Sequence, residues 1–299
     1  MPFLRERSGR WSPEKIVAFV GAIAPILWLA WRTWTNDLGP RPFDEATHVT
    51  GSWAVRFILI ALAVTPARRI FNAPKLILMR RTLGVAAFGY ALVHFCIYIG
   101  GERLDLAKVA SEIVLRFYLT IGFVAFVGLV ALASTSTDGM VRRLGSARWN
   151  KLHTIVYVIA ILAIVHFLLQ TKLDIYESIM MAGFLVWLFG YRALHRWTGD
   201  VTVWQLLALA VIAALATAGG EAAWYSVGTG VDASRVLAVN FDPDAGLRPA
   251  AWVLICGLAV AAAALVFRLL KPHSPRGRRS SPRSSPSAVS GATQLQSGS

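Results

Sequence analysis

The chain of 299 residues is 56% hydrophobic, and only 15% of its residues are charged. Soluble domains have about 25% charged residues, so this composition excludes an ordinary soluble protein and indicates one built into a membrane. The net charge of +14 could indicate a nucleic-acid partner. The basic residues gather at the two ends and in alternate loops, however, which is the pattern of membrane topology. We therefore expect a lipid bilayer, and no nucleic acid, around the chain.

Eight apolar runs are candidates for transmembrane helices, because a hydrocarbon core of about 30 Å takes about 20 helical residues. The second run is short unless it begins nearer residue 49. The runs cover residues 16–34, 51–65, 82–100, 113–134, 152–170, 176–194, 203–219 and 250–270. The sequence thus predicts an all-α fold, a polytopic transmembrane bundle of about eight helices.

Basic and non-basic segments alternate along the chain: the N-terminal segment, every second loop and the C-terminal tail carry the excess of Lys and Arg. Because basic loops stay on the cytoplasmic side, we expect both termini in the cytoplasm. No small-residue cleavage site follows the first run, so we expect it to be retained as a helix. Cys96 and Cys256 stand alone in apolar runs, without CxxC or CxxCH, and are expected to be small buried hydrophobes.

Two histidines lie deep inside apolar runs, where ionisable side chains are costly and usually mark a function. His94 and His166 are residues 13 and 15 of two parallel helices, counted from residues 82 and 152, and both lie about 20 Å from the cytoplasmic ends. A single membrane histidine could simply hydrogen-bond across helices. Two neutral imidazoles at one depth, however, can occupy both axial positions of a haem iron. That arrangement leaves no open position for a substrate and suits electron transfer.

His153 is a weaker candidate. It lies about 20 Å below His166 on the same predicted helix, and the matching position on the third helix is Arg81, which is not a usual iron ligand. His153 could therefore contact a second cofactor, a propionate or a quinone headgroup, or have no special role. The remaining histidines are at loops or helix ends and are expected to be ordinary surface residues: His48, His195 and His273.

Several separated blocks carry a family resemblance. They are TGSWAVRFILIALAVTPARR (50–69), RRTLGVAAFGYALVHFCIY (80–98) and the segment 118–167, which contains TS before a basic loop, the pattern RLG…W..LH and a terminal HF. Over residues 50–194 the chain resembles the MsrQ (YedZ) family, the haem-binding membrane subunit of the periplasmic protein-methionine-sulfoxide reductase system. That family belongs to the ferric-reductase-like transmembrane superfamily.

The resemblance implies haem b, an associated FMN (hence a flavoprotein) and membrane quinol as electron source. It also implies a soluble, molybdenum-containing periplasmic subunit that reduces methionine sulfoxide in oxidised proteins, and a location in the bacterial inner membrane. By position, His94, His153 and His166 match the family's three membrane histidines. Of these, the depth pairing described above predicts His94 and His166 as the iron ligands. No motif locates the FMN, and no Gly-rich dinucleotide motif is present.

The family core has six helices, whereas this chain has two more. We therefore expect four parts: residues 1–48 with the first helix, a ferric-reductase-like haem-binding core at 49–195, two extra helices with an outer loop at 196–271, and a disordered, basic, Ser/Pro-rich tail at 272–299.

The leading hypothesis is an electron-transfer subunit of an oxidoreductase complex, which does not itself contain the sulfoxide-reducing centre. One alternative is a b561-like or ferric-reductase-like membrane cytochrome with another acceptor. Another is a haem-free transporter or membrane scaffold, in which the histidines relay protons or brace helices. Neither inverted repeats nor paired broken helices support a transporter.

Overall fold

The computed structural model describes residues 11–172 and 174–270 and contains no β-strand in those ranges. Eight helical segments among these residues are long and apolar enough to cross a membrane. The predicted all-α polytopic bundle is thereby confirmed. The predictions for the tail at 272–299 and for His273 lie outside the described residues.

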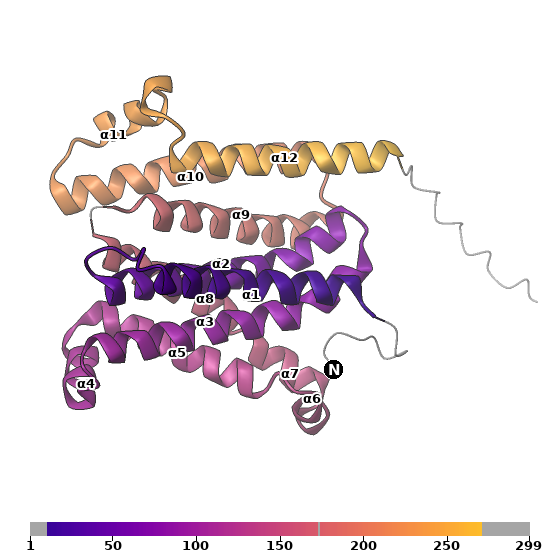
Figure 1. Ribbon diagram of the computed structural model, residues 1–299. Helices are drawn as coiled ribbons and strands as arrows, with labels where there is room; N and C mark the ends of the chain where they lie inside the picture. Colours follow the sequence, from indigo (N-terminus) through magenta and orange to yellow (C-terminus); the bar gives the residue numbers. More distant parts are fainter. Residues whose placement is uncertain (1–10, 173, 271–299) are drawn as a thin grey trace, which may run out of the picture.

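Figure 1 shows the order of the elements along the chain. They are α1 (Pro13–Trp34), α2 (Pro42–Ile70), the 3₁₀ helix η2 (Pro74–Leu78), α3 (Met79–Gly101), α4 (Leu106–Leu115), α5 (Phe117–Ser134), α6 (Asp138–Leu144), α7 (Ser146–His153), α8 (Val156–Thr171), α9 (Tyr176–Thr198), α10 (Val203–Thr229), α11 (Ala233–Asn240), the 3₁₀ helix η3 (Pro243–Ala245) and α12 (Pro249–Leu270).

Several boundaries differ from the apolar runs. α2 is much longer than its run, because a polar first turn with Pro at its start precedes the apolar part. The predicted helix at 113–134 is divided at Arg116, whose backbone is extended, so that α4 is a separate short helix. The predicted helix at 152–170 begins instead with α7, which ends at His153 before α8 starts. α10 continues through much of the predicted outer loop.

The bundle has two distinct ends. α4 and α11 lie at one end, on the left of Figure 1, and α6 and α7 lie at the other. We call these the α4 end and the α6 end. α1 begins and α12 ends at the α6 end, as an even number of spans requires.

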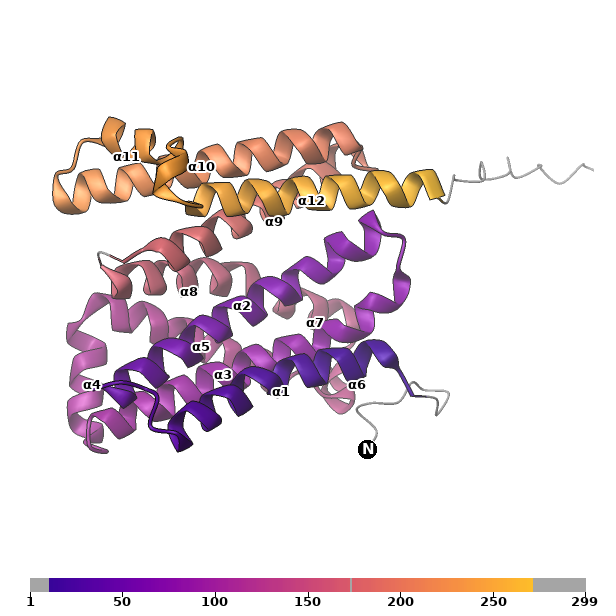
Figure 2. The same ribbon diagram turned by 45° about the horizontal axis from the view of Figure 1, so that its top comes forward.

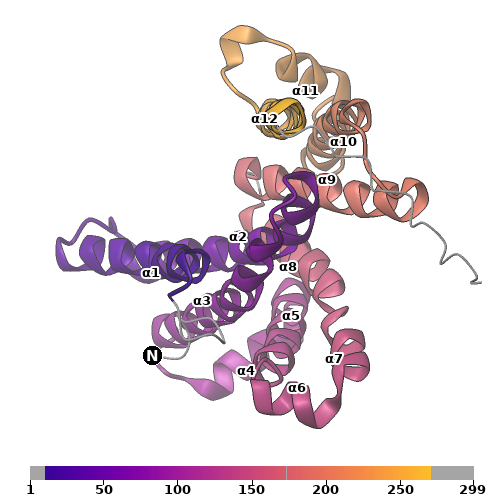
Figure 3. The same cartoon turned by 90° about the vertical axis from the view of Figure 1, so that its right-hand side faces the viewer.

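Four helices form the centre of the molecule. α2 packs against α3, α5 packs against α8, and the two pairs meet through contacts of α3 with α5 and of α2 with α8. α1 packs on the outside of α3 and projects from the bundle in Figure 3. There the Tyr90 hydroxyl of α3 donates to the carbonyl of Ala22, at 2.9 Å.

α10 and α12 form a separate pair that covers α9, as Figure 2 shows. Small residues allow this close approach: a Cβ added at Gly183 of α9 would lie 2.7 Å from Cγ2 of Val253. At the α4 end the carboxylate of Glu221, which is only 1% exposed, accepts from Arg248 and from the Asn240 amide. This buried contact ties α11 and the start of α12 to α10.

The two cysteines are not buried, contrary to the prediction. Cys96 and Cys256 are both exposed on the surfaces of membrane-spanning helices. A helix in a bilayer can leave small apolar side chains facing lipid, so an apolar run does not distinguish a protein-facing from a lipid-facing position.

Candidate functional site

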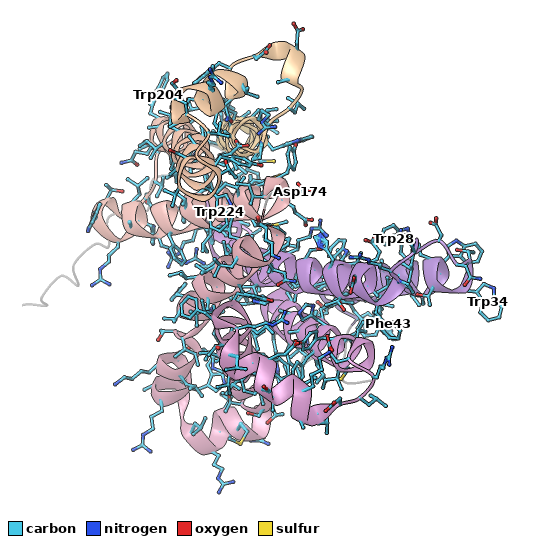
Figure 4. All side chains as sticks on the ribbon, turned by 90° about the vertical axis from the view of Figure 1, so that its left-hand side faces the viewer. Trp28, Trp34, Phe43, Asp174, Trp204 and Trp224 are labelled. Carbon is cyan, nitrogen blue, oxygen red and sulfur yellow. The ribbon has the colours of Figure 1, made fainter. Side chains whose placement is uncertain are left out.

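A cavity of about 760 Å³ lies between α2, α3, α5 and α8 and reaches the α4 end. This volume is in the range of about 300–1,000 Å³ that is typical of cofactor and ligand pockets. Figure 4 looks onto the α4 end and labels two residues of the cavity rim, Phe43 from α2 and Asp174 from the connection between α8 and α9.

The cavity lining changes from apolar to polar toward the α4 end. Its apolar part includes Val55, Ile58, Phe126 and Leu129. The polar part is lined by His48, Tyr98, Glu112, Arg116 and Gln170, among others. Such a lining suits an amphiphilic ligand with an apolar body and charged groups at one end.

Hydrogen bonds and ion pairs fix the side chains of the polar part of the lining, which we call the polar rim. Glu112 accepts from the Tyr98 hydroxyl at 2.7 Å and from the Arg116 guanidinium at 3.0 Å. Arg116 also contacts the Tyr118 hydroxyl at 3.1 Å, and this contact raises the pKa of the guanidinium. The Glu102 carboxylate, 2.6 Å from the Lys108 ammonium, raises the pKa of that group. Arg116, which lines the cavity, and Lys108, which pairs with the lining residue Glu102, therefore both stay charged.

The cavity brings together the two histidines that the sequence analysis paired. The ring centroids of His94 and His166 are 6.3 Å apart, and the ring planes cross at 86°. Because a metal–imidazole bond is about 2 Å long and each ring nitrogen lies about 1 Å from its centroid, two imidazoles on opposite sides of one metal have centroids about 6 Å apart. The spacing therefore fits one shared metal ion.

Each of the two imidazoles is oriented by a neighbouring helix. Nδ1 of His94 donates to the carbonyl of Thr47 on α2, and Nδ1 of His166 donates to the carbonyl of Tyr118 on α5, both at 2.8 Å. A carbonyl only accepts, so the ring proton is on Nδ1 and the lone pair is on Nε2. Neither Nε2 has a hydrogen-bond partner among the described residues, which leaves both free to bind a metal.

The protein supplies only part of a coordination sphere at this point. Within residues 11–172 and 174–270, no group of three or more His, Cys, Asp or Glu side chains could hold a metal ion. A metal between His94 and His166 therefore needs further ligands from a non-protein group. A planar tetrapyrrole supplies four nitrogens in one plane and leaves the two axial positions to imidazoles. The residues present thus fit a haem.

An internal repeat, not among the predictions above, relates the two halves of the site. His94 stands in ALVHF (91–95) and His166 in AIVHF (163–167). In each half the histidine helix is preceded in the chain by the helix whose carbonyl accepts the Nδ1 proton. A direct comparison of the eight apolar runs with one another would have found this match, in which four of the five residues are identical.

His153 lies apart from this cavity, at the end of α7. Its ring stacks on Trp149, with centroids 3.7 Å apart and planes inclined by 24°. Nδ1 is 3.1 Å from the carbonyl of Trp149, and Nε2 is 3.4 Å from the hydroxyl of Ser136. Both ring nitrogens thus have protein partners, and a cofactor-binding role for His153 stays a prediction.

Two histidines expected to be ordinary surface residues are in less ordinary places. His48 is exposed, yet it lines the cavity and its ring centroid is 5.7 Å from that of Phe167. His195 is half-buried and stacks on Tyr191, with planes inclined by 1°. His48 was expected in the loop between the first two apolar runs. It lies within α2 instead, because that helix begins before its apolar run.

The comparisons with a family model and with individual proteins agree on the family of this chain. Residues 50–164 match the family described as "Ferric reductase like transmembrane component". The chain is 37% identical over 187 residues to the "Protein-methionine-sulfoxide reductase heme-binding subunit MsrQ" of Caulobacter vibrioides, which covers 62% of this chain and 88% of that protein. It is 42% identical over 188 residues to the protein of the same name from Xanthomonas euvesicatoria pv. vesicatoria, covering 60% of this chain and 84% of that one.

The protein of that name from Rhodospirillum rubrum is 40% identical over 189 residues, covering 63% of this chain and 88% of its own. No solved structure matches the chain. The shared segments include nearly the whole length of each relative, and the match to the ferric-reductase-like family spans His94 and His153. The chain therefore belongs to the MsrQ family of ferric-reductase-like transmembrane proteins.

Proposed function

We propose that the chain is a haem b-binding membrane subunit that passes electrons to a methionine-sulfoxide reductase, with His94 and His166 as the axial ligands of the iron. One observation carries the proposal: two imidazoles with free Nε2 atoms lie in one cavity, with centroids 6.3 Å apart and no third His, Cys, Asp or Glu ligand among the described residues. The names of the relatives, which describe heme-binding subunits, support it.

The chain's own groups perform three tasks at this site. The carbonyls of Thr47 and Tyr118 orient the imidazoles and make them better ligands. The apolar wall formed by residues such as Phe126 and Leu129 excludes water, and the polar rim with Arg116 receives the propionates. A haem held in this way supplies one-electron transfer.

The sulfoxide itself is reduced elsewhere in this proposal. Two histidine ligands leave the iron no position for a substrate, so the acceptor is a separate protein. Methionine sulfoxide takes two electrons and two protons and gives methionine and water; the electrons arrive one at a time through the membrane subunit. We assign the acceptor as a soluble, molybdenum-containing periplasmic subunit, the donor as membrane quinol, and FMN as an associated cofactor, all from the family resemblance.

The proposed orientation places the α4 end in the periplasm and the α6 end, with both termini, in the cytoplasm of the bacterial inner membrane. The support is the concentration of basic residues in the connections at the α6 end, which follows the positive-inside rule. These residues are Arg68, Arg69, Lys75, Arg80, Arg81, Arg142, Arg143, Arg148 and Lys151. The cavity then opens toward the compartment of the acceptor, and His153, at the end of α7, lies near the cytoplasmic side.

Residues 49–195 form the redox core in this proposal, because they include the matched segment and most of the four helices around the cavity. The first turns of α2, with Thr47 and His48, precede this range and also line the cavity. Of the accessory unit at 196–271, the described helices α10 and α12 pack on α9, and none of its described residues lines the cavity.

The test uses the purified full-length protein. A pyridine haemochrome assay gives the haem-to-protein ratio, and reduced-minus-oxidised absorbance shows whether a b-type haem is present. His94→Ala and His166→Ala should each abolish the signal, whereas His195→Ala, a half-buried histidine away from the cavity, should retain it. An unchanged spectrum in both ligand variants, or a wild-type protein without haem, would overturn the assignment and favour the transporter or scaffold.

The acceptor is tested by reconstitution. The reduced protein in vesicles is offered either a periplasmic methionine-sulfoxide reductase or a ferric chelate, and reoxidation is followed by absorbance. We expect rapid reoxidation by the sulfoxide reductase. Reoxidation by the ferric chelate alone would instead support the ferric-reductase alternative, which the description of the matched family favours.

A further inference from the structure

We propose that Gly51 and Gly122 are positioning residues, which set the rotation of the His94 and His166 rings and thereby the near-perpendicular arrangement of the two imidazole planes. The proposal rests on the proposed function in one respect, namely that these rings bind a haem iron. It assigns a role to two residues on helices that carry no ligand.

The geometry of an α-helix explains why glycine is needed at these places. The N–H of residue i+4 bonds to the carbonyl of residue i, so the Cα of residue i+4 lies beside that carbonyl. A ring that donates to this carbonyl from a neighbouring helix must therefore pass over the same turn. Gly51 stands four residues after Thr47, and Gly122 stands four residues after Tyr118.

The contacts at both glycines leave no room for a side chain. A Cβ added at Gly51 would be 2.8 Å from Nδ1 and 2.9 Å from Cε1 of His94. A Cβ added at Gly122 would be 2.7 Å from Nδ1, 2.8 Å from Cε1 and 3.0 Å from Cγ of His166. The rings thus lie flat against the backbone of the neighbouring helix, and an alanine would force each ring to rotate or the two helices to separate.

The recurrence of the arrangement is the second, independent observation. The same set of carbonyl, glycine at i+4 and histidine Nδ1 occurs once between α2 and α3 and once between α5 and α8. Glycine inside a helix costs about 1 kcal/mol relative to alanine. Two such costs at matching positions of an internal repeat indicate that the space above each turn is required.

Ring rotation matters because the electronic structure of a bound haem iron depends on the angle between the two imidazole planes. Planes that cross at 86°, as in this structure, give low-spin ferric haem a single, strongly shifted low-field EPR feature, whereas more nearly parallel planes give a rhombic, three-line spectrum. Rotation also weakens the Nδ1–carbonyl hydrogen bond, which tunes the donor strength of Nε2 and the potential of the iron.

The test compares Gly51→Ala and Gly122→Ala with two matched controls in the full-length holoprotein. In Gly128→Ala, also on α5, the added Cβ would be 2.8 Å from Cδ1 of Ile159 on α8, so it perturbs the same helix pair without touching a histidine. In Gly89→Ala, on α3, the added Cβ would meet nothing within 4 Å. The readouts are the EPR spectrum, the midpoint potential and the haem-to-protein ratio.

We expect each of the two site variants to lose about 10- to 100-fold in haem affinity, as outer-sphere variants of metal sites commonly do. The haem that remains should show a shifted EPR feature and a shifted midpoint potential. Both controls should keep the wild-type spectrum and potential. If one site variant fails to fold, the other tests the same geometry in the second helix pair, and ¹⁵N-histidine NMR of the haem-free protein reads the Nδ1–H tautomer directly.

Site variants with wild-type EPR and potential would overturn this proposal, as would Gly128→Ala producing the same shifts. Its failure can be told apart from failure of the proposed function. In the first case, wild type still binds haem and loses it in His94→Ala and His166→Ala; in the second, haem is absent or independent of those histidines.

Discussion

Replacing Ala163 with leucine tests whether the cavity between the four helices is the haem pocket. Ala163 lines the cavity one turn before His166 on the same face of α8, so its side chain lies where a haem bound to His166 would have to fit. In the haem-free protein, leucine enters existing space. Three additional carbons at about 0.8 kcal/mol each stabilise that form by up to about 2 kcal/mol. The haem-bound form is instead overpacked.

Overpacking costs about 1–3 kcal/mol, which corresponds to roughly a 10- to 100-fold loss of haem affinity. The variant should therefore show two opposite effects: a higher thermal unfolding temperature of the haem-free protein and a lower haem-to-protein ratio. The matched control is Ala160→Leu, one turn away on α8, at a position only 1% exposed and outside the cavity. There leucine should destabilise the haem-free protein by about 1–3 kcal/mol.

The assays are thermal unfolding in detergent, followed by near-ultraviolet circular dichroism, and the pyridine haemochrome ratio. A fully loaded Ala163→Leu protein with the wild-type spectrum would refute the reasoning, because the ring would then lie elsewhere. Equal destabilisation by Ala163→Leu and Ala160→Leu would also refute it, since the cavity would then have no usable space.

Three further predictions concern the rest of the molecule. Arg248→Ala leaves the buried Glu221 carboxylate without its charged partner and should lower the free energy of unfolding by about 3–5 kcal/mol in a denaturant titration, with no change in the haem spectrum. Gly183→Ala drives a methyl group into Thr217 where α9 meets α10 and should cost about 1–3 kcal/mol by the same titration, again with wild-type haem content. His153→Ala should leave the EPR signal of the His94–His166 site unchanged; loss of that signal would show that α7 controls the cavity.

The fold was largely predictable because transmembrane helices are recognised in a sequence by the length and the apolar composition of their runs. All eight spans were found, and the depth count that paired His94 with His166 needed only the helical rise and two run boundaries. Two kinds of boundary differ from the prediction: α2 and α10 continue beyond their apolar runs, and the runs at 113–134 and 152–170 are each divided between two helices. Hydropathy cannot show where such helices end.

The partners of the ligands could not be predicted in the same way. Nothing in the sequence distinguishes the carbonyl of Thr47 or Tyr118 from any other, because the choice depends on how α2 and α5 are rotated against α3 and α8. Gly51 and Gly122 likewise look like the many glycines of membrane helices until the rings above them are seen. The position of His48 on the cavity rim depends on the same packing.

The site is therefore specified by pairs of helices rather than by the two helices that carry the ligands. Each histidine is presented by one helix and oriented by its neighbour, which supplies a carbonyl and an adjacent glycine on a single turn. Both pairs use the same arrangement, so that each Nδ1 proton is directed to the neighbouring helix. A change in the rotation of α2 or α5 would turn an imidazole without altering a histidine. In the proposed haem site, the packing of these two helices would therefore help to set the geometry at the iron.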